Sequence, residues 1–177
     1  MPVSINEIVE DSVADLLSRS GDMHVELSVS GLDQPVTALG NATLLKGCIA
    51  NFLDNAVAYG KPGKPGKPSK PGKPSNGQSL HIAIRVAPSA ETGQILLSVA
   101  DNGPGLTQEQ AARLQQRWAR GQGSERLQGG AGLGLAIVAR YAELLGAVFT
   151  LSTDGDSGGL CATLALQTRA VGSIKSG

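Results

Sequence analysis

Three segments of the chain repeat apolar residues at the spacing of a helix that buries one face. They span about residues 5–19, 41–59 and 135–145. Ser4 and Glu7 can form a capping box for the first helix, and Asn41 can cap the second. Gly146 follows the third segment, as glycine often follows a helix end. The sequence therefore predicts three main helices.

Other segments alternate apolar and polar residues with the two-residue period of a half-buried strand. They lie near residues 23–29, 36–39, 80–86, 94–100, 148–152 and 160–166. The short 36–39 strand is a candidate partner for the 23–29 strand. This order predicts a two-layer α/β (α+β) sandwich, with three main helices on one face of a mixed, mostly antiparallel sheet of about five strands.

The composition favours one globular domain with a hydrophobic core. The chain has 177 residues, of which 41% are hydrophobic. No apolar run reaches the roughly eighteen residues of a membrane span, and no signal-peptide pattern opens the chain. We expect residues 1–167 to form the domain and 168–177 a flexible tail. For Cys48 and Cys161, which lack metal-ligand spacing, buried free thiols are favoured over a bridge or a ligand pair.

Charge is distributed unevenly along a chain with 15 basic and 15 acidic residues. Five lysines fall in residues 61–75, which repeat Lys-Pro-Gly or Lys-Pro-Ser. Proline at every third position predicts a solvated, polyproline-like loop, an insertion over residues 61–77. A tolerated surface insertion is favoured, and attraction of anions or acidic surfaces is the alternative. The rest of the chain carries a net charge of −5, which argues against a nucleic-acid partner.

Two glycine-rich stretches flank a basic segment in the second half of the chain. The first reads Asp-Asn-Gly-Pro-Gly-Leu from Asp101, and the second reads Gly-Gly-Ala-Gly-Leu-Gly-Leu from Gly129. Four arginines lie between them: Arg113, Arg117, Arg120 and Arg126. The pattern predicts a mobile phosphate-binding lid over about residues 103–131, hinged at its two ends, with a short helix over 107–118.

Three polar side chains are candidates for ligand chemistry. Asp101 shares the inward parity of the apolar residues of the 94–100 strand. A buried carboxylate needs a donor, such as an adenine amino group, although a turn at the strand rim is the alternative. Asn51 and Asn55 share one helix face, where neutral amide oxygens can hold hydrated magnesium and its phosphates. A solvated helix shoulder is the alternative for this pair.

Taken in order, these motifs resemble those of sensor histidine kinases. Asn-Phe-Leu-Asp-Asn-Ala from Asn51 resembles the asparagine box of that family, and the Asp101 motif and Gly-Ala-Gly-Leu-Gly-Leu-Ala-Ile-Val from Gly130 resemble two glycine boxes. Gln-Arg-Trp-Ala-Arg-Gly from Gln116 is similar to the lid box. The resemblance covers about residues 2–167. It implies the C-terminal catalytic domain, with the left-handed ATP-binding (Bergerat, or GHKL-type) sandwich of ninety-kilodalton heat-shock chaperones, type II topoisomerases and mismatch-repair ATPases.

The resemblance also implies roles for individual residues. Asp101 would read the adenine amino group, and Tyr59 would lie against the nucleotide. Asn55, helped by Asn51, would coordinate magnesium. The lid would stabilise the transferring phosphate through two arginines, Arg117 and Arg120. The remaining ATP-binding positions belong to the glycine boxes: Gly103, Gly105, Leu106, Gly130, Gly132, Leu133, Gly134 and Leu135.

The chain departs from the family's pattern at two positions. Ala58 stands where many relatives carry lysine or arginine, and Gly47 where many carry glutamate, glutamine or histidine. These losses shift charge stabilisation toward the lid arginines. His24 and His81 occupy polar strand positions and are expected at the surface. The phosphoacceptor histidine is therefore expected on a separate dimerisation domain.

The resemblance implies a catalytic domain that binds Mg-ATP and donates the γ-phosphate to that histidine, without phosphorylating itself. The implied partners are the dimerisation domain and a response regulator, with no nucleic acid. The whole protein would be a membrane-anchored homodimer with this domain on the cytoplasmic side of an inner membrane. The alternatives are an anti-sigma-type serine kinase, against which Gly47 argues, another ATPase of the same fold, and a non-catalytic nucleotide-sensing module.

Overall fold

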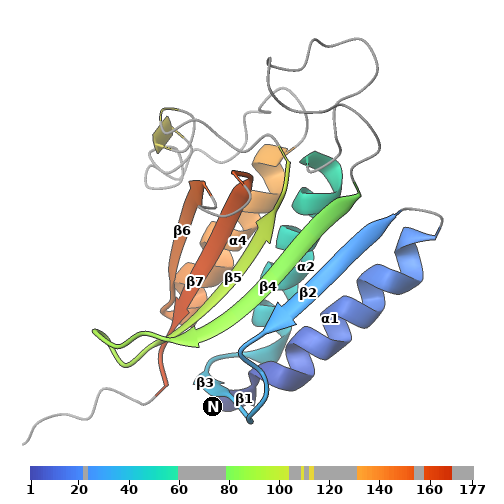
Figure 1. The fold of residues 1–177 in the computed structure, drawn as a ribbon. Coiled ribbons are helices and arrows are strands. Elements are labelled where there is room, and N and C mark those ends of the chain that lie inside the picture. The colour runs from blue at the N-terminus through green and yellow to red at the C-terminus, as the bar shows by residue number, and fades with distance from the viewer. Residues whose placement is uncertain are drawn as a thin grey trace, which may run out of the picture.

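A computed structural model describes residues 1–21, 24–59, 79–103, 109, 112–113, 131–153 and 158–168. The lysine-proline insertion, most of the lid and residues 169–177 lie outside this description, which includes only residues 109, 112 and 113 of the predicted 107–118 helix. In chain order the elements are β1 (Pro2–Ser4), α1 (Ile5–Ser20), β2 (Val25–Ser30), β3 (Thr37–Leu39), α2 (Ala42–Tyr59), β4 (Leu80–Pro88), β5 (Ile95–Asp101), α4 (Ala131–Leu145), β6 (Val148–Thr153) and β7 (Leu160–Leu166). Helices α1, α2 and α4 cover one face of the main sheet (Figure 1). The predicted two-layer sandwich is confirmed.

The main sheet has five strands in the order β2-β4-β5-β7-β6. Strands β2 and β4 run parallel, and every other neighbouring pair is antiparallel. The mixed, mostly antiparallel sheet is therefore as predicted. Because parallel neighbours need a crossover, the chain between β2 and β4 passes through α2 on the helical face.

The predicted partner of the 36–39 strand is wrong. Strand β3 pairs with β1 in a separate two-stranded sheet, where Val3 lies opposite Ala38. The sequence prediction missed β1 because three residues are too few to show a two-residue period. Pairing with the start of the chain places the beginning of β3 beside the N-terminal turn of α1, where Ile5 N donates to Val36 O at 2.9 Å.

Side-chain caps start two of the helices where the sequence predicts. Glu7 N donates to Ser4 Oγ at 3.3 Å, and Leu44 N donates to Asn41 Oδ1 at 3.1 Å. Helix α4, in contrast, begins at Ala131, four residues before the predicted start. Glycine disfavours helix, so the Gly-rich sequence predicts a loop, but packing of α4 on α2 outweighs that preference.

The core lies between the helices and the sheet. Leu45, Ile49 and Leu53 on α2 are fully buried, as are Ile84 on β4 and Leu97 on β5. Burial of aliphatic side chains of this size contributes roughly 1.5–3 kcal/mol each to the free energy of unfolding. The helix–sheet interface is therefore the main source of folding stability. None of the helices within the described residues is long and apolar enough to span a membrane.

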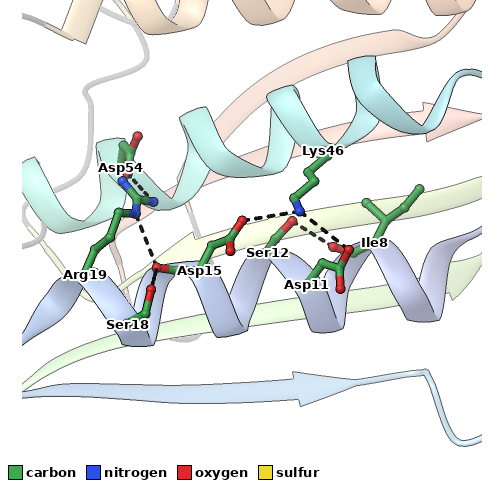
Figure 2. Close-up of polar contacts among 8 residues, drawn as sticks. All are labelled: Ile8, Asp11, Ser12, Asp15, Ser18, Arg19, Lys46 and Asp54. Atoms are coloured by element: carbon green, nitrogen blue, oxygen red, sulfur yellow. Dashed lines mark hydrogen bonds and ion pairs between the residues drawn. The ribbon is translucent and has the colours of Figure 1, made fainter.

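Ion pairs join α1 to α2 along their exposed edge (Figure 2). Lys46 Nζ lies 3.3 Å from Asp15 Oδ2 and 3.5 Å from Asp11 Oδ2, and Arg19 lies 3.3 Å from Asp54. The hydrogen bond to Asp15 is the main cause that raises the pKa of Lys46 above its usual value. All of these side chains except Asp11 border a cleft of about 320 Å³ between the two helices. Since the pairs are exposed, each adds little to stability.

The thiol of Cys48 is predicted to be chemically inert in the folded chain. Both cysteines are buried and free, and burial raises the pKa of Cys48 to about 12. The thiolate is the reactive form, so at pH 8 an aromatic disulfide reagent should leave folded Cys48 unmodified and label it after unfolding in guanidinium. A Cys161→Ser variant isolates the signal. Stoichiometric labelling of that folded variant would contradict the buried placement of Cys48.

Candidate functional site

Asp101 ends β5 with its carboxylate turned into the protein. The residue is 5% exposed, as the strand parity predicts. Its Oδ1 accepts from Gly103 N at 2.8 Å and from Leu160 N at 3.3 Å. A carboxylate offers about four acceptor sites. Two backbone donors on one oxygen therefore fix the orientation of this carboxylate.

The turn before β7 packs directly on this aspartate. A Cβ on Gly159 would lie 1.8 Å from Asp101 O and 2.7 Å from Asp101 Oδ1, so only glycine fits there. Together with Leu160, Gly159 forms one wall of the site. The sequence analysis did not single out these glycines as part of the site. The available signal was a glycine pair directly before a buried strand, which marks close backbone approach as well as a turn.

Asn102 fastens the end of β5 to the start of β4. Its Oδ1 accepts from His81 N at 2.9 Å and its Nδ2 donates to Ser79 O at 3.2 Å, while its backbone N donates to His81 O at 3.2 Å. These bonds hold the chain in register immediately beyond Asp101. Asn102 is therefore a positioning residue that the sequence did not single out.

Asn51 and Asn55 face the same glycine of α4. A Cβ on Gly134 would lie 3.1 Å from Asn51 Oδ1 and 3.4 Å from Asn55 Oδ1. The two amide oxygens thus converge on one spot, as their spacing predicts. Gly134 stands inside a helix, and its lack of a side chain lets α4 approach the two amides closely.

The two asparagines differ in how their amides are satisfied. Asn51 Nδ2 donates to Gly47 O, one turn earlier, at 2.8 Å. Asn55 Nδ2 is buried and finds no hydrogen-bond partner within the described part of the chain. An unpaired buried donor costs about 1–3 kcal/mol, so this group is suited to a ligand oxygen.

The elements that carry these residues meet at one end of the sandwich. The end of β5, the last turns of α2 and the first turn of α4 lie together there (Figure 1). Tyr59 is the last residue of α2, which places its backbone at this end. Gly132 and Leu133 belong to the first turn of α4.

The remaining predicted site residues are distributed as follows. Gly103 is buried beside Asp101. Leu135 is 2% exposed and belongs to the hydrophobic core. The others lie outside the described residues: Gly105, Leu106, Arg117, Arg120 and Gly130.

Both histidines lie at the surface, as predicted. His24 is exposed just before β2. The side chain of His81 is 43% exposed, with Nε2 3.2 Å from Ser28 Oγ and Nδ1 3.6 Å from Glu26. Strand β4 therefore presents His81 to solvent on its polar side.

Comparison with known proteins assigns this architecture to a family. Residues 40–170 match the profile described as "Histidine kinase-, DNA gyrase B-, and HSP90-like ATPase". The chain belongs to this family. Among sequences, this histidine kinase-type ATPase domain is 31% identical over 158 residues to the swarming motility regulation sensor protein RssA of Serratia marcescens. It is also 31% identical over 143 residues to the sensor protein kinase PmrB of Pseudomonas aeruginosa.

These relatives are longer than the chain. The match covers 89% of the ATPase domain and 29% of RssA, and 81% of the domain and 26% of PmrB. Among solved structures, the mycobacterial sensor histidine kinase MprB superposes with a TM-score of 0.66 at 22% identity, covering 96% of this chain and 99% of that one. The fold is therefore that of the ATPase domain of sensor histidine kinases.

Proposed function

We propose that this domain binds Mg-ATP between the end of β5, the last turns of α2 and the first turn of α4, and donates the γ-phosphate to a histidine on a separate domain. One observation carries the proposal: the amides of Asn51 and Asn55 converge on Gly134, and Asn55 Nδ2 is buried without a partner in the described chain. Such a group favours a ligand rich in acceptor oxygens.

Asp101 is the proposed adenine-reading residue. The adenine amino group donates hydrogen bonds, and a buried carboxylate is a strong acceptor for them. Backbone donors from Gly103 and Leu160 hold the carboxylate in place. Pre-organisation of this kind lowers the entropy cost of binding. It also disfavours guanine, whose carbonyl would face the carboxylate.

Asn55 is the proposed magnesium ligand, assisted by Asn51. Oxygen donors suit this ion, and neutral amides avoid repulsion of the phosphates. The convergence of both Oδ1 atoms on Gly134 fits such a donor set. When bound, magnesium neutralises phosphate charge. The protein groups orient the phosphates, and Asn55 Nδ2 gains an acceptor.

Residue 47 bears on the choice between kinase and hydrolase. A carboxylate at this position could serve as a base, but Gly47 has no side chain and the ring of Tyr141 fills the space beside it. We therefore propose that this domain supplies positioning and electrostatics, with Arg117 and Arg120 bracing the transferred phosphate. The acceptor histidine and the base beside it come from another domain. This favours a histidine kinase over a serine kinase or an independent ATPase.

The partners of the complete protein follow from the same proposal. The relatives are sensor proteins several times longer than their matched part. By analogy, the domain works with a phosphoacceptor domain and a response regulator, within a membrane-anchored homodimer, on the cytoplasmic side. Tyr59 and the predicted glycine positions would contact the nucleotide through aromatic and backbone surfaces.

Calorimetry with ATP tests the proposed function. Saturable binding that weakens at least tenfold when EDTA replaces MgCl₂ is expected. Radiolabelled phosphate should then appear on a histidine-bearing dimerisation domain added in trans, and none on this chain alone. Binding without any phosphate transfer would favour a nucleotide-sensing module. The absence of saturable binding would rule out both the kinase domain and the nucleotide-sensing module.

Arg120 is predicted to act on phosphate transfer more than on nucleotide binding. Arg120→Ala should slow transfer to the added domain about tenfold or more, because charge develops on the phosphoryl group during transfer, while ADP affinity changes less than about threefold. Arg140→Ala, which removes an exposed arginine paired with Glu143 on α4, is the matched control and should affect neither. Equal losses of rate and ADP affinity in Arg120→Ala would make this arginine a ground-state contact only.

A further inference from the structure

A ring on α4 occupies the space that a side chain at residue 47 would need. A Cβ built on Gly47 would lie 2.7 Å from Tyr141 Cε2 and 3.2 Å from Cδ2. Contacts below 3.0 Å force a neighbour to move, and an aromatic ring moves as a rigid body. Tyr141 is half-buried and packs against the hydrophobic core, so it cannot swing freely into solvent.

The carbonyl of Gly47 also orients Asn51. Asn51 Nδ2 donates to Gly47 O at 2.8 Å, while Asn51 Oδ1 lies on the side of Gly134. An amide has one acceptor end and one donor end. Anchoring the donor end on Gly47 therefore turns the oxygen toward α4, where the proposed phosphate and magnesium contacts lie.

The contact of Gly47 with Tyr141 and that of Asn51 with Gly134 both lie in the interface between α2 and α4. Gly47, Asn51 and Asn55 recur at four-residue spacing on α2, and Gly134 and Tyr141 lie about two turns apart on α4. Helices α2 and α4 have the most extensive contact of any helix pair in the described chain. A change of spacing at Tyr141 is therefore transmitted along α4 to Gly134 and the asparagine oxygens.

We infer that Gly47 and Tyr141 form a positioning pair for the nucleotide site: the ring seats against the bare backbone of Gly47, and this contact sets both the α2–α4 spacing and the orientation of Asn51. The inference rests on the proposed role of Asn51 in holding the nucleotide phosphates. It also explains why residue 47 is glycine in this chain, where many relatives carry a polar side chain. The glycine is required by the tyrosine, and the polar side chain of many relatives has no room here.

Coupled substitutions test the pair. Gly47→Ala is expected to weaken Mg-ATP binding about tenfold by calorimetry, although alanine favours helix. Adding Tyr141→Leu to this variant should restore affinity to within about threefold of Tyr141→Leu alone, because the ring is gone. Adding Tyr141→Phe should not restore it, because the ring remains.

Gly40→Ala is the matched control. It also adds one methyl group close to α4, 3.1 Å from Leu145 Cδ2, but has no contact with Asn51. Its affinity should equal that of the unsubstituted chain. Three results would refute the positioning pair: normal Mg-ATP affinity in Gly47→Ala, no recovery of affinity when Tyr141→Leu is added to it, or a loss of affinity in Gly40→Ala as large as in Gly47→Ala.

The side-chain amide resonance of Asn51 gives a readout that needs no nucleotide. Gly47→Ala should shift the Nδ2 cross-peak of Asn51. Adding Tyr141→Leu to that variant should return the cross-peak toward its original position. An unshifted resonance refutes the pair even where the proposed function holds. Failure of the unsubstituted chain to bind Mg-ATP, with the resonance coupled as expected, refutes the proposed function and leaves the pair in place.

Discussion

Asp101→Asn is expected to lower ADP affinity about 100-fold while leaving the fold intact. The amide oxygen of asparagine can still accept from Gly103 N and Leu160 N, which now hold Oδ1. Its NH₂ group would then point toward the ligand. A donor would face the adenine amino group, itself a donor, and the loss of a charge-assisted hydrogen bond with an unpaired buried group costs about 3 kcal/mol. Calorimetry with ADP measures the change.

Two comparisons make this result specific. Asp54→Asn is the same substitution at an exposed carboxylate of α2, paired with Arg19, and should leave affinity unchanged. The preference for ADP over GDP should shrink in Asp101→Asn, because the new NH₂ group can donate to the guanine carbonyl. An Asp101→Asn variant that binds ADP within about threefold of the original chain would contradict the adenine-reading role.

Replacing Asn55 by alanine is expected to change stability and affinity in opposite directions. The buried Nδ2 lacks a partner in the described chain, so its removal relieves a desolvation cost, and alanine also favours helix. The free energy of unfolding should rise by about 1 kcal/mol, equivalent to roughly 2–4 °C in Tm. Affinity for Mg-ATP should fall by about 10- to 100-fold, since a metal and phosphate contact is lost.

Asn51→Ala is the matched variant on the same helix face. Its Nδ2 is already bonded to Gly47 O, so the substitution should weaken Mg-ATP binding without increasing stability. Denaturant unfolding and calorimetry on both variants check the contrast. A destabilised Asn55→Ala would mean that the amide has a structural partner, and unchanged affinity would mean that it has no ligand role. A gain in stability at a cost in function is typical of binding sites.

The helices and the inward-facing residues were predictable because they follow local periods. Ser4 and Asn41 cap helices in the folded chain as the sequence predicts. Asp101 is buried because its position along β5 fixes its face. Asn51 and Asn55 share a face because they are about one helical turn apart. Each of these features depends on a few neighbouring residues.

Strand partners and the start of α4 were not predictable in the same way. Strand β3 pairs with β1, and β2 pairs in parallel with β4, which lies beyond a whole helix in the sequence. Strand edges offer similar hydrogen-bonding groups, so packing of distant apolar faces selects the partner. Helix α4 begins among glycines because contact with α2 stabilises a turn that its own residues disfavour.

For the site, the sequence by itself determined which polar groups are present and which way they face: the carboxylate of Asp101 inward, and the two amides of Asn51 and Asn55 together. Only the tertiary structure decided what three glycines do. Gly134 admits the asparagine oxygens, Gly159 admits Asp101, and Gly47 admits the ring of Tyr141. The sequence shows only that no side chain covers the backbone at a glycine. What approaches it depends on a second segment, and that segment is chosen by the packing of the whole chain.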